Sequence, residues 1–198
     1  YLHSFPTRRA SDLTTLPGVN TIADGTAVKT PGSNIFPYIK KNLDDIITVE
    51  DDELIVAFLD MVENHKMIVE NSGLLTVAAL KHLGVKDKRV VSILSGGNMD
   101  VITMSSVVQQ GLIFRDRIFT VSVLLPDKPG ELAKVSQTLA DVQGNVIKLE
   151  HNQFVTTNRS AAVELRITLE CFGTEHKEQI IAALEKKGYK PRIVRTMI

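Results

Sequence analysis

Residues 90–100 run Val90-Val91-Ser92-Ile93-Leu94-Ser95-Gly96-Gly97-Asn98-Met99-Asp100, an apolar segment that passes directly into a small, glycine-rich turn. Short β-branched apolar runs bounded by turn residues are typical of strands buried in a sheet. In an open α/β sheet, ligands bind outside the carboxyl ends of the strands, and glycines let the backbone approach a flat or charged group. The segment therefore predicts an α/β fold with a ligand site at this turn, where the hydroxyl of Ser95 points into the crevice.

The surrounding sequence, over residues 14–112, alternates short apolar runs with amphipathic segments, which is the pattern of an α/β domain. Thr48, followed by Asp51 three residues later, resembles a helix start, and the acidic residues there suit the positive end of a helix dipole. The predicted elements are a strand at 46–49, helices at 50–64 and 74–83, and the strand at 90–94.

A second unit begins after the short charged segment 113–117, which we interpret as a linker. Apolar residues alternate along strand-like runs or recur at helical spacing, and turn residues separate the runs. The predicted order is strand 118–125, helix 131–142, strand 146–154, a hairpin loop at 156–159, strand 161–172, helix 175–187 and strand 190–195. This βαββαβ order predicts a ferredoxin-like domain over residues 118–198, with one antiparallel sheet and both helices on one face.

The composition favours a soluble cytoplasmic protein and excludes several classes of partner. Lys and Arg together number 23, as do Asp and Glu, so no net charge directs the chain to nucleic acid or to a membrane surface. No apolar run is long enough to span a bilayer, and the N-terminus lacks the hydrophobic core of a signal peptide. The one cysteine, Cys171, is predicted to be a core residue in a reducing compartment. The five histidines lack metal-ligand spacing, so we predict no metal site.

The first thirteen residues are interpreted as foreign to the protein. The segment Tyr1-Leu2-His3-Ser4-Phe5-Pro6-Thr7-Arg8-Arg9-Ala10-Ser11-Asp12-Leu13 has no starting Met and no helical or strand period. It resembles the translated sequencing-adapter peptide that contaminates reading frames. We therefore expect a truncated gene product that begins in the middle of a domain.

Several ordered blocks of sequence carry a family resemblance. They are Thr21-Ile22-Ala23-Asp24-Gly25-Thr26-Ala27-Val28-Lys29-Thr30-Pro31-Gly32, then Val69-Glu70-Asn71-Ser72-Gly73, then Leu94-Ser95-Gly96-Gly97-Asn98-Met99-Asp100. Together they resemble threonine ammonia-lyase (threonine dehydratase), a family of pyridoxal-phosphate enzymes with the tryptophan-synthase-β fold, fold type II. In the second unit, Asp127-Lys128-Pro129-Gly130-Glu131-Leu132 and Gly144-Asn145-Val146-Ile147 resemble the ligand loop and strand entry of an ACT domain. The resemblance covers residues 14–198.

The lyase resemblance implies α,β-elimination of water from L-threonine, which ends as 2-oxobutanoate and ammonia, with pyridoxal 5′-phosphate as the cofactor. It places Ser95 at the pyridine nitrogen of the cofactor. It also implies cofactor-binding roles for Gly96, Gly97, Asn98, Glu70, Asp24 and Gly25. Each position has a simpler interpretation: Ser95 as a helix cap, Glu70 as a solvated carboxylate, and Asp24-Gly25 as an ordinary turn.

Two features of the family are missing from the chain. The family's Schiff-base lysine lies in a Ser-Phe-Lys-x-Arg-Gly block and its phosphate cup is a run of glycines, and neither occurs here. Lys29 lies in a different block and does not match that lysine. We therefore assign no catalytic residue and expect the fragment itself to be inactive, with the activity residing in the complete gene product.

The ACT resemblance implies an allosteric amino-acid effector, isoleucine or valine, as in isoleucine biosynthesis. The effector-binding residues that it implies are Asp127, Pro129, Gly130, Glu131, Leu132 and Asn145. Asp127 would hold the ammonium of the ligand, and the backbone N–H groups before the helix would hold its carboxylate. The loop is also a good turn in any protein, and Asn145 after Gly144 suits a left-handed conformation. Exposed sheet edges predict pairing of ACT domains in a homo-oligomer.

Two alternatives to the threonine enzyme stay open at this point. Serine dehydratase and serine racemase share the catalytic blocks, so L-serine is an alternative substrate, but these enzymes commonly lack the ACT unit. The other alternative is a non-catalytic, amino-acid-binding dimerisation module, which the missing lysine favours for this polypeptide.

Overall fold

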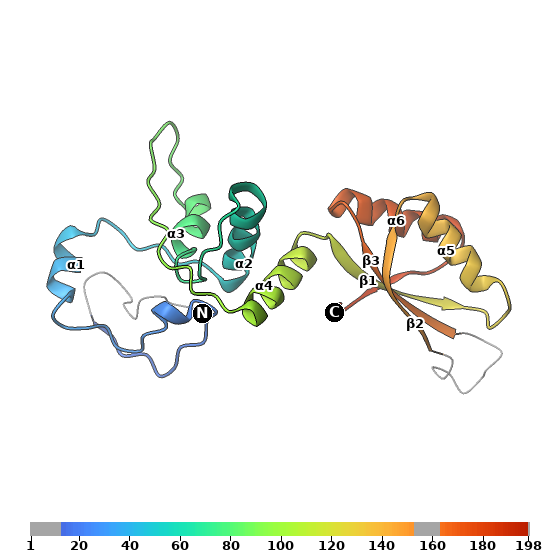
Figure 1. The fold of residues 1–198 in the computed structure, drawn as a ribbon, viewed down its shortest axis with the longest axis horizontal. Helices are drawn as coiled ribbons and strands as arrows, with labels where there is room; N and C mark the ends of the chain where they lie inside the picture. The colour runs from blue at the N-terminus through green and yellow to red at the C-terminus, as the bar shows by residue number, and fades with distance from the viewer. Residues whose placement is uncertain (1–12, 153–162, 198) are drawn as a thin grey trace. The chain divides into compact units, whose positions relative to one another are not determined.

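The computed structural model describes residues 13–152 and 163–197, and the chain divides into two units, Tyr1–Gly111 and Leu112–Ile198 (Figure 1). The hairpin loop predicted at 156–159 and almost all of the segment interpreted as foreign lie outside the described residues.

The second unit has the predicted βαββαβ order. Its strands form one antiparallel sheet in the order β2-β3-β1-β4, and its two helices cover one face of that sheet (Figure 1). The elements are β1 (Ile118–Leu125), α5 (Glu131–Asp141), β2 (Asn145–Asn152), β3 (Val163–Glu170), α6 (Thr174–Lys186) and β4 (Arg192–Val194). The ferredoxin-like prediction is confirmed, although β4 is shorter than the predicted strand 190–195.

Alternation along β1 explains why one face of this sheet is buried under helices. Phe119, Val121, Val123 and Leu125 are at most 3% exposed and pack against apolar side chains of α5 and α6. Successive side chains of a strand point to opposite faces, so Thr120 and Ser122 lie on the face away from the helices. Cys171 belongs to the same core, as predicted, and burial raises the pKa of its thiol.

The first unit is helical in its regular elements. They are the 3-10 turn η1 (Asp24–Thr26), α1 (Phe36–Asn42), α2 (Asp51–Asp60), the π-helical turn η2 (Met61–His65), α3 (Leu75–Ala78), the 3-10 turn η3 (Ala79–His82) and α4 (Val101–Phe114), which ends within the second unit. Its core is built on α2, where Leu54, Ile55 and Phe58 are at most 3% exposed. In neither described part of the chain is any helix both long and apolar enough to cross a membrane.

The strands predicted at 46–49 and 90–94 are wrong as regular elements, because no strand forms within residues 13–117. A strand satisfies its backbone N–H and C=O groups by pairing with a neighbour, and neither segment has one there. Val91 and Ile93 are 88% and 73% exposed, so these two apolar side chains are uncovered, and only Leu94 packs against the core of the unit. Residues 90–94 therefore have the composition of a buried strand but have no neighbouring strand to pair with.

The helices of this unit differ from the prediction at their starts. The pairing of Thr48 with Asp51 does not cap α2: the side chain of Glu53 accepts the N–H of Glu50 at 2.8 Å, while Asp51 accepts the hydroxyl of Thr21 at 2.7 Å. Two helices, α1 and α4, were missed. Each carries a start signal, Pro37 in the first turn of α1 and Asp100 before α4.

Asp116, in the segment interpreted as a linker, is bound to the start of α6. Its carboxylate accepts the ammonium of Lys177 at 2.6 Å and the hydroxyl of Thr174 at 2.8 Å, and its carbonyl accepts the thiol of Cys171 at 2.7 Å. The hydrogen bond from Lys177, with that from Thr174, holds the pKa of Asp116 below its ordinary value. The charged form of Asp116 is therefore part of how the second unit is stabilised.

Replacing Lys177 with Met is expected to lower the free energy of unfolding of the second unit by about 1–2 kcal/mol near pH 7. A carboxyl whose pKa is depressed by folding stabilises the fold above its unfolded pKa, about 3.9, and loses that contribution as the pH falls through the folded pKa. The difference between Lys177→Met and the parent should therefore shrink below about pH 4. Urea unfolding at pH 7 and at pH 2.5 measures it, with Lys186→Met as the control. An equal loss at both pH values would assign the effect to packing.

Candidate functional site

The three blocks of the first unit meet around Glu70. The backbone N–H of Glu70 donates to the carbonyl of Gly96 at 3.3 Å, which joins the second block to the third. The amide of Asn71 donates to the carbonyl of Ile22 at 3.0 Å, which joins the second block to the first. Segments far apart in sequence are thereby brought together by the fold.

Glycines at these junctions allow contacts that any side chain would block. A Cβ on Gly96 would lie 2.1 Å from the carboxyl carbon of Glu70, and Gly96 has a φ of +78°. A Cβ on Gly73 would lie 2.0 Å from the carbonyl oxygen of Ser95. The second and third blocks therefore touch backbone to backbone, and the close approach predicted for the Gly96 turn is made to Glu70 of the same chain.

A cavity of about 240 Å³ opens beside this junction. Of the predicted cofactor-binding residues, Asp24, Glu70 and Asn98 line it. Gly25 does not line it, but a Cβ there would lie 2.8 Å from the hydroxyl of Ser72 and 3.6 Å from the carboxylate of Glu70. Ser95, Gly96 and Gly97 form the adjoining turn but do not line the cavity, and Ser95 is exposed.

The prediction missed several lining residues. Asn71 is 6% exposed, and its side-chain oxygen, like the hydroxyl of neighbouring Ser72, has no hydrogen-bond partner among the described residues. Asp100 accepts the backbone N–H groups of Ile102 and Thr103, both at 2.9 Å, and hydrogen bonds from Thr103 lower its pKa. The other lining residues are Thr21, Ile22, Met99 and Thr103. The sequence offered one signal for these residues, because each of the three quoted blocks contains a polar residue that lines the cavity.

The charges of the cavity decide what part of a ligand it suits. Asp24, Glu70 and Asp100 line it, and its described lining holds no Lys, Arg or His. Carboxylates repel a phosphate and favour cations or hydrogen-bond donors. The unpartnered side-chain oxygen of Asn71 adds a polar group able to bind a heteroatom. In the part that the structure describes, no group of three or more His, Cys, Asp and Glu residues could hold a metal ion.

The predicted effector loop of the second unit is open to solvent. Asp127, Pro129 and Gly130 are exposed, and Gly130 precedes α5 with a φ of +90°. Glu131, in the first turn of α5, binds the ammonium of Lys134 at 2.7 Å, and Leu132 is 40% exposed. The loop thus presents the carboxylate of Asp127 and the N-terminal end of α5 on one exposed turn, where the N–H of Glu131 already donates to the carbonyl of Lys128 at 3.3 Å.

Asn145 does not lie beside this loop. Asn145 and Ile118 both face Glu170 in the sheet register, whereas the loop follows Leu125 at the other end of β1. Seven steps along a strand span about 23 Å. The amide of Asn145 also donates to the carboxylate of Glu170 at 3.0 Å. Within one chain, the predicted effector residues therefore do not converge.

Comparisons with known proteins agree with the division of the chain into two units. Residues 3–96 match the family described as pyridoxal-phosphate dependent enzyme, and residues 119–188 match the ACT domain. The chain is 37% identical over 176 residues to an L-threonine ammonia-lyase of Geobacter sulfurreducens, an alignment that covers 88% of this chain and 44% of that protein. It is 34% identical over 178 residues to an L-threonine ammonia-lyase of Thermotoga maritima, covering 89% of this chain and 44% of that one.

Among solved structures, the processed form of threonine deaminase isoform 2 from Solanum lycopersicum is 28% identical, with a TM-score of 0.47 over 50% of this chain and 28% of that chain. The chain spans less than half the length of both curated relatives.

Proposed function

Because residues 3–96 belong to the pyridoxal-phosphate dependent enzyme family and residues 119–188 to the ACT domain family, we propose that the chain is part of an L-threonine ammonia-lyase controlled by an amino-acid effector. The observation that carries the proposal is the pairing of these two domains, in this order, across an alignment that covers 88% of the chain. The substrate is L-threonine, with L-serine as the alternative, and the place of action is the cytoplasm.

The residues around Glu70 are assigned to one side of the cofactor site. Pyridoxal 5′-phosphate, when bound, supplies an electron sink that lets the Cα proton and then the β-hydroxyl of the substrate leave. The cavity fits the polar edge of the ring better than the phosphate, because its described lining carries carboxylates and the unpartnered amide oxygen of Asn71. The residues that would hold the cofactor are Ser95, Gly96, Gly97, Asn98, Glu70, Asp24 and Gly25.

Ser95 has the role with the clearest chemistry. A neutral hydroxyl donates a hydrogen bond to the ring nitrogen without giving it a full proton, so the ring withdraws electrons moderately. Asp24 and Glu70 add negative charge on that side and favour the ammonium of an amino acid. Release of 2-oxobutanoate from L-threonine by a longer protein that adds the family's lysine block to this chain tests the assignment.

The effector site is assigned to two copies of the chain. Asp127 and Asn145 lie at opposite ends of the sheet, so one ligand can touch both only if a second copy supplies one of them. The strands β2 and β4 are the two edges of the sheet, and along β2 Val146, Ile147 and Leu149 are 37–45% exposed. An unpaired edge with apolar side chains suits pairing with another copy in a homo-oligomer. The effector is isoleucine or valine, held at its ammonium by Asp127.

Mixing two defective variants is expected to restore part of the binding that each has lost. Asp127→Ala and Asn145→Ala should each weaken isoleucine binding at least about tenfold, since a charge-assisted or buried polar contact is removed. In mixed dimers one site combines the intact Asp127 of one copy with the intact Asn145 of the other. Titration calorimetry after random exchange should then find about one quarter of the parental sites.

Asp141→Ala, which removes an exposed carboxylate from α5, is the control and should bind like the parent. Mixtures as weak as the separate variants would show that Asp127 and Asn145 do not form one site across two copies. No heat with isoleucine, valine, threonine or serine would refute the effector assignment.

A further inference from the structure

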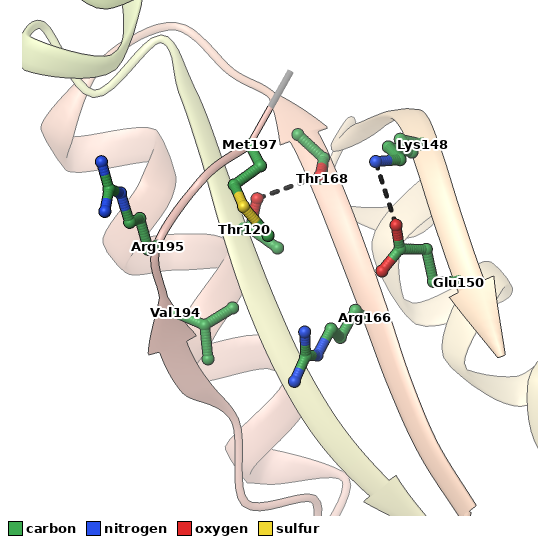
Figure 2. A pocket seen from close by; sticks show the side chains of 8 residues that line it. All are labelled: Thr120, Lys148, Glu150, Arg166, Thr168, Val194, Arg195 and Met197. Carbon is green, nitrogen blue, oxygen red and sulfur yellow. Dashed lines mark hydrogen bonds and ion pairs between the residues drawn. The ribbon is translucent and has the colours of Figure 1, made fainter. Parts of the chain in front are cut away.

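A second polar cavity, of about 260 Å³, lies on the face of the ACT sheet that carries no helix (Figure 2). It contains none of the residues of the effector loop. Its lining consists of Thr120, Lys148, Glu150, Arg166, Thr168, Val194, Arg195 and Met197.

The strand register explains why these residues meet. Lys148 faces Thr168, Thr168 faces Thr120, and Thr120 faces Val194, so one row crosses all four strands. Glu150 faces Arg166 in the next row on the same side. Residues directly opposite each other in an antiparallel sheet share a face, so β2, β3, β1 and β4 all contribute side chains to this one surface.

The floor of the cavity is a pair of buried hydroxyls. Thr120 and Thr168 are 5% and 4% exposed, and their hydroxyl oxygens lie 3.0 Å apart. One hydrogen bond between two hydroxyls uses one of their two protons, so the pair keeps one O–H that can donate to a ligand. A hydrogen-bond acceptor on a ligand bound over the pair would satisfy this buried O–H donor.

The walls of the cavity are mainly cationic. Lys148, Arg166 and Arg195 carry three positive charges against one negative charge on Glu150, which lies 2.9 Å from the ammonium of Lys148. Figure 2 shows Arg166 extending from β3 across β1 toward Val194. The lining residues therefore carry a net charge of about +2, or about +1 once Glu164, the carboxylate partner of Arg166, is counted, and this positive balance attracts an anion.

Hydrogen bonds with neighbouring side chains fix the position of Arg166. Its Nε donates to the carboxylate of Glu164 at 3.1 Å, and the hydroxyl of Ser122 donates to the other oxygen of Glu164 at 2.6 Å. The hydrogen bond from Ser122, with that from Arg166, lowers the pKa of Glu164, so the carboxylate stays charged at neutral pH. Using Nε leaves the two terminal nitrogens of the guanidinium as further donors.

The same charges argue against a second copy as the occupant. A two-fold face-to-face contact would bring this net positive surface of one copy against the same surface of the other. Like charges brought together in this way are repulsive. Val194 and Met197 give the cavity one apolar side, which suits a short aliphatic group attached to the anion.

We propose that this face of the ACT sheet binds a small organic anion, with its carboxylate or phosphate group over the Thr120–Thr168 pair and among the cationic side chains that line the cavity, Lys148, Arg166 and Arg195. The site shares no residue with the proposed amino-acid site, although Asn145 faces Glu170 beside the row of Thr168 on the same face of the sheet. Arg195→Gln and Thr168→Val leave Asp127 and Asn145 unchanged, so the two sites can fail independently.

Titration of the whole chain with butanoate and, separately, with inorganic phosphate tests the proposal, followed by amide chemical shifts. Binding should shift the amides of β1 and β3 around Thr120 and Thr168. Arg195→Gln should weaken binding about tenfold or more, as expected for loss of a charge-assisted hydrogen bond. Thr168→Val, which keeps the shape but removes a hydroxyl, should weaken it about fivefold.

Lys186→Gln is the matched control, because it removes the same charge from the end of α6 on the helical side of the sheet and should change affinity less than twofold. Tighter binding of butanoate would indicate a carboxylate ligand with an aliphatic tail, and tighter binding of phosphate a phosphate ester. Three results would overturn the proposal: no shift with either anion, equal effects of Arg195→Gln and Lys186→Gln, or shifts confined to residues 127–130.

Discussion

The 198-residue chain, purified and supplied with pyridoxal 5′-phosphate and L-threonine, is expected to release no 2-oxobutanoate. The sequence lacks the lysine block that would link the cofactor covalently and the glycine run that would hold its phosphate. The cavity at Glu70 cannot replace the phosphate seat, because Asp24, Glu70 and Asp100 line it and would repel a phosphate. The rate should therefore match that of free cofactor in buffer.

Detection of 2-oxobutanoate by chromatography measures this outcome, and retention of cofactor colour after gel filtration gives a second readout. A longer protein that adds the missing blocks to the same chain is the positive control. Its turnover should fall with Ser95→Ala if Ser95 binds the ring nitrogen. Turnover by the 198-residue chain above the free-cofactor rate would mean that another lysine serves and that the assignment of the blocks is wrong.

Gly73→Ala is expected to destabilise the first unit strongly, whereas Gly97→Ala in the same site should change little. The new Cβ at Gly73 would lie 2.0 Å from the carbonyl oxygen of Ser95 and 2.8 Å from the side chain of Val69. The first neighbour is backbone and cannot rotate away, so the two turns must separate. Overpacking of this kind costs about 1–3 kcal/mol and occasionally more.

Gly97 supplies a matched control, since its Cβ would come no nearer than 3.6 Å to the carbonyl of Ile68. Hydrogen exchange of the amides of α2 reports the stability of this unit separately from that of the ACT domain. Equal protection in the two variants would show that the contact between Gly73 and Ser95 is not needed for stability.

Residues 118–198 could be predicted closely because their signals are local. Alternation along β1 and helical spacing along α5 and α6 identify the elements, and their order alone selects the ferredoxin-like sheet. Elements between residues 46 and 94 were harder to predict. The run 90–94 has the composition of a buried strand, yet Val91 is 88% exposed, because pairing depends on a neighbour that the run itself does not encode.

The candidate site was likewise predicted only in part from the sequence. The three blocks could be found one by one, and so could Asp24, Glu70 and Asn98, which line one cavity. Asn71 and Asp100 were missed, because burial and cap geometry depend on which segments meet.

Sequence alone was enough to divide the chain into its two kinds of unit and to identify the motifs of each, since composition, periodicity and turn chemistry act over a few neighbouring residues. Only the tertiary structure separated Asp127 from Asn145 by the length of β1 and gathered Lys148, Thr168, Thr120 and Val194 into one row. Strand register is set by packing between residues far apart in the chain, and a shift of one residue would turn every side chain of that row to the other face.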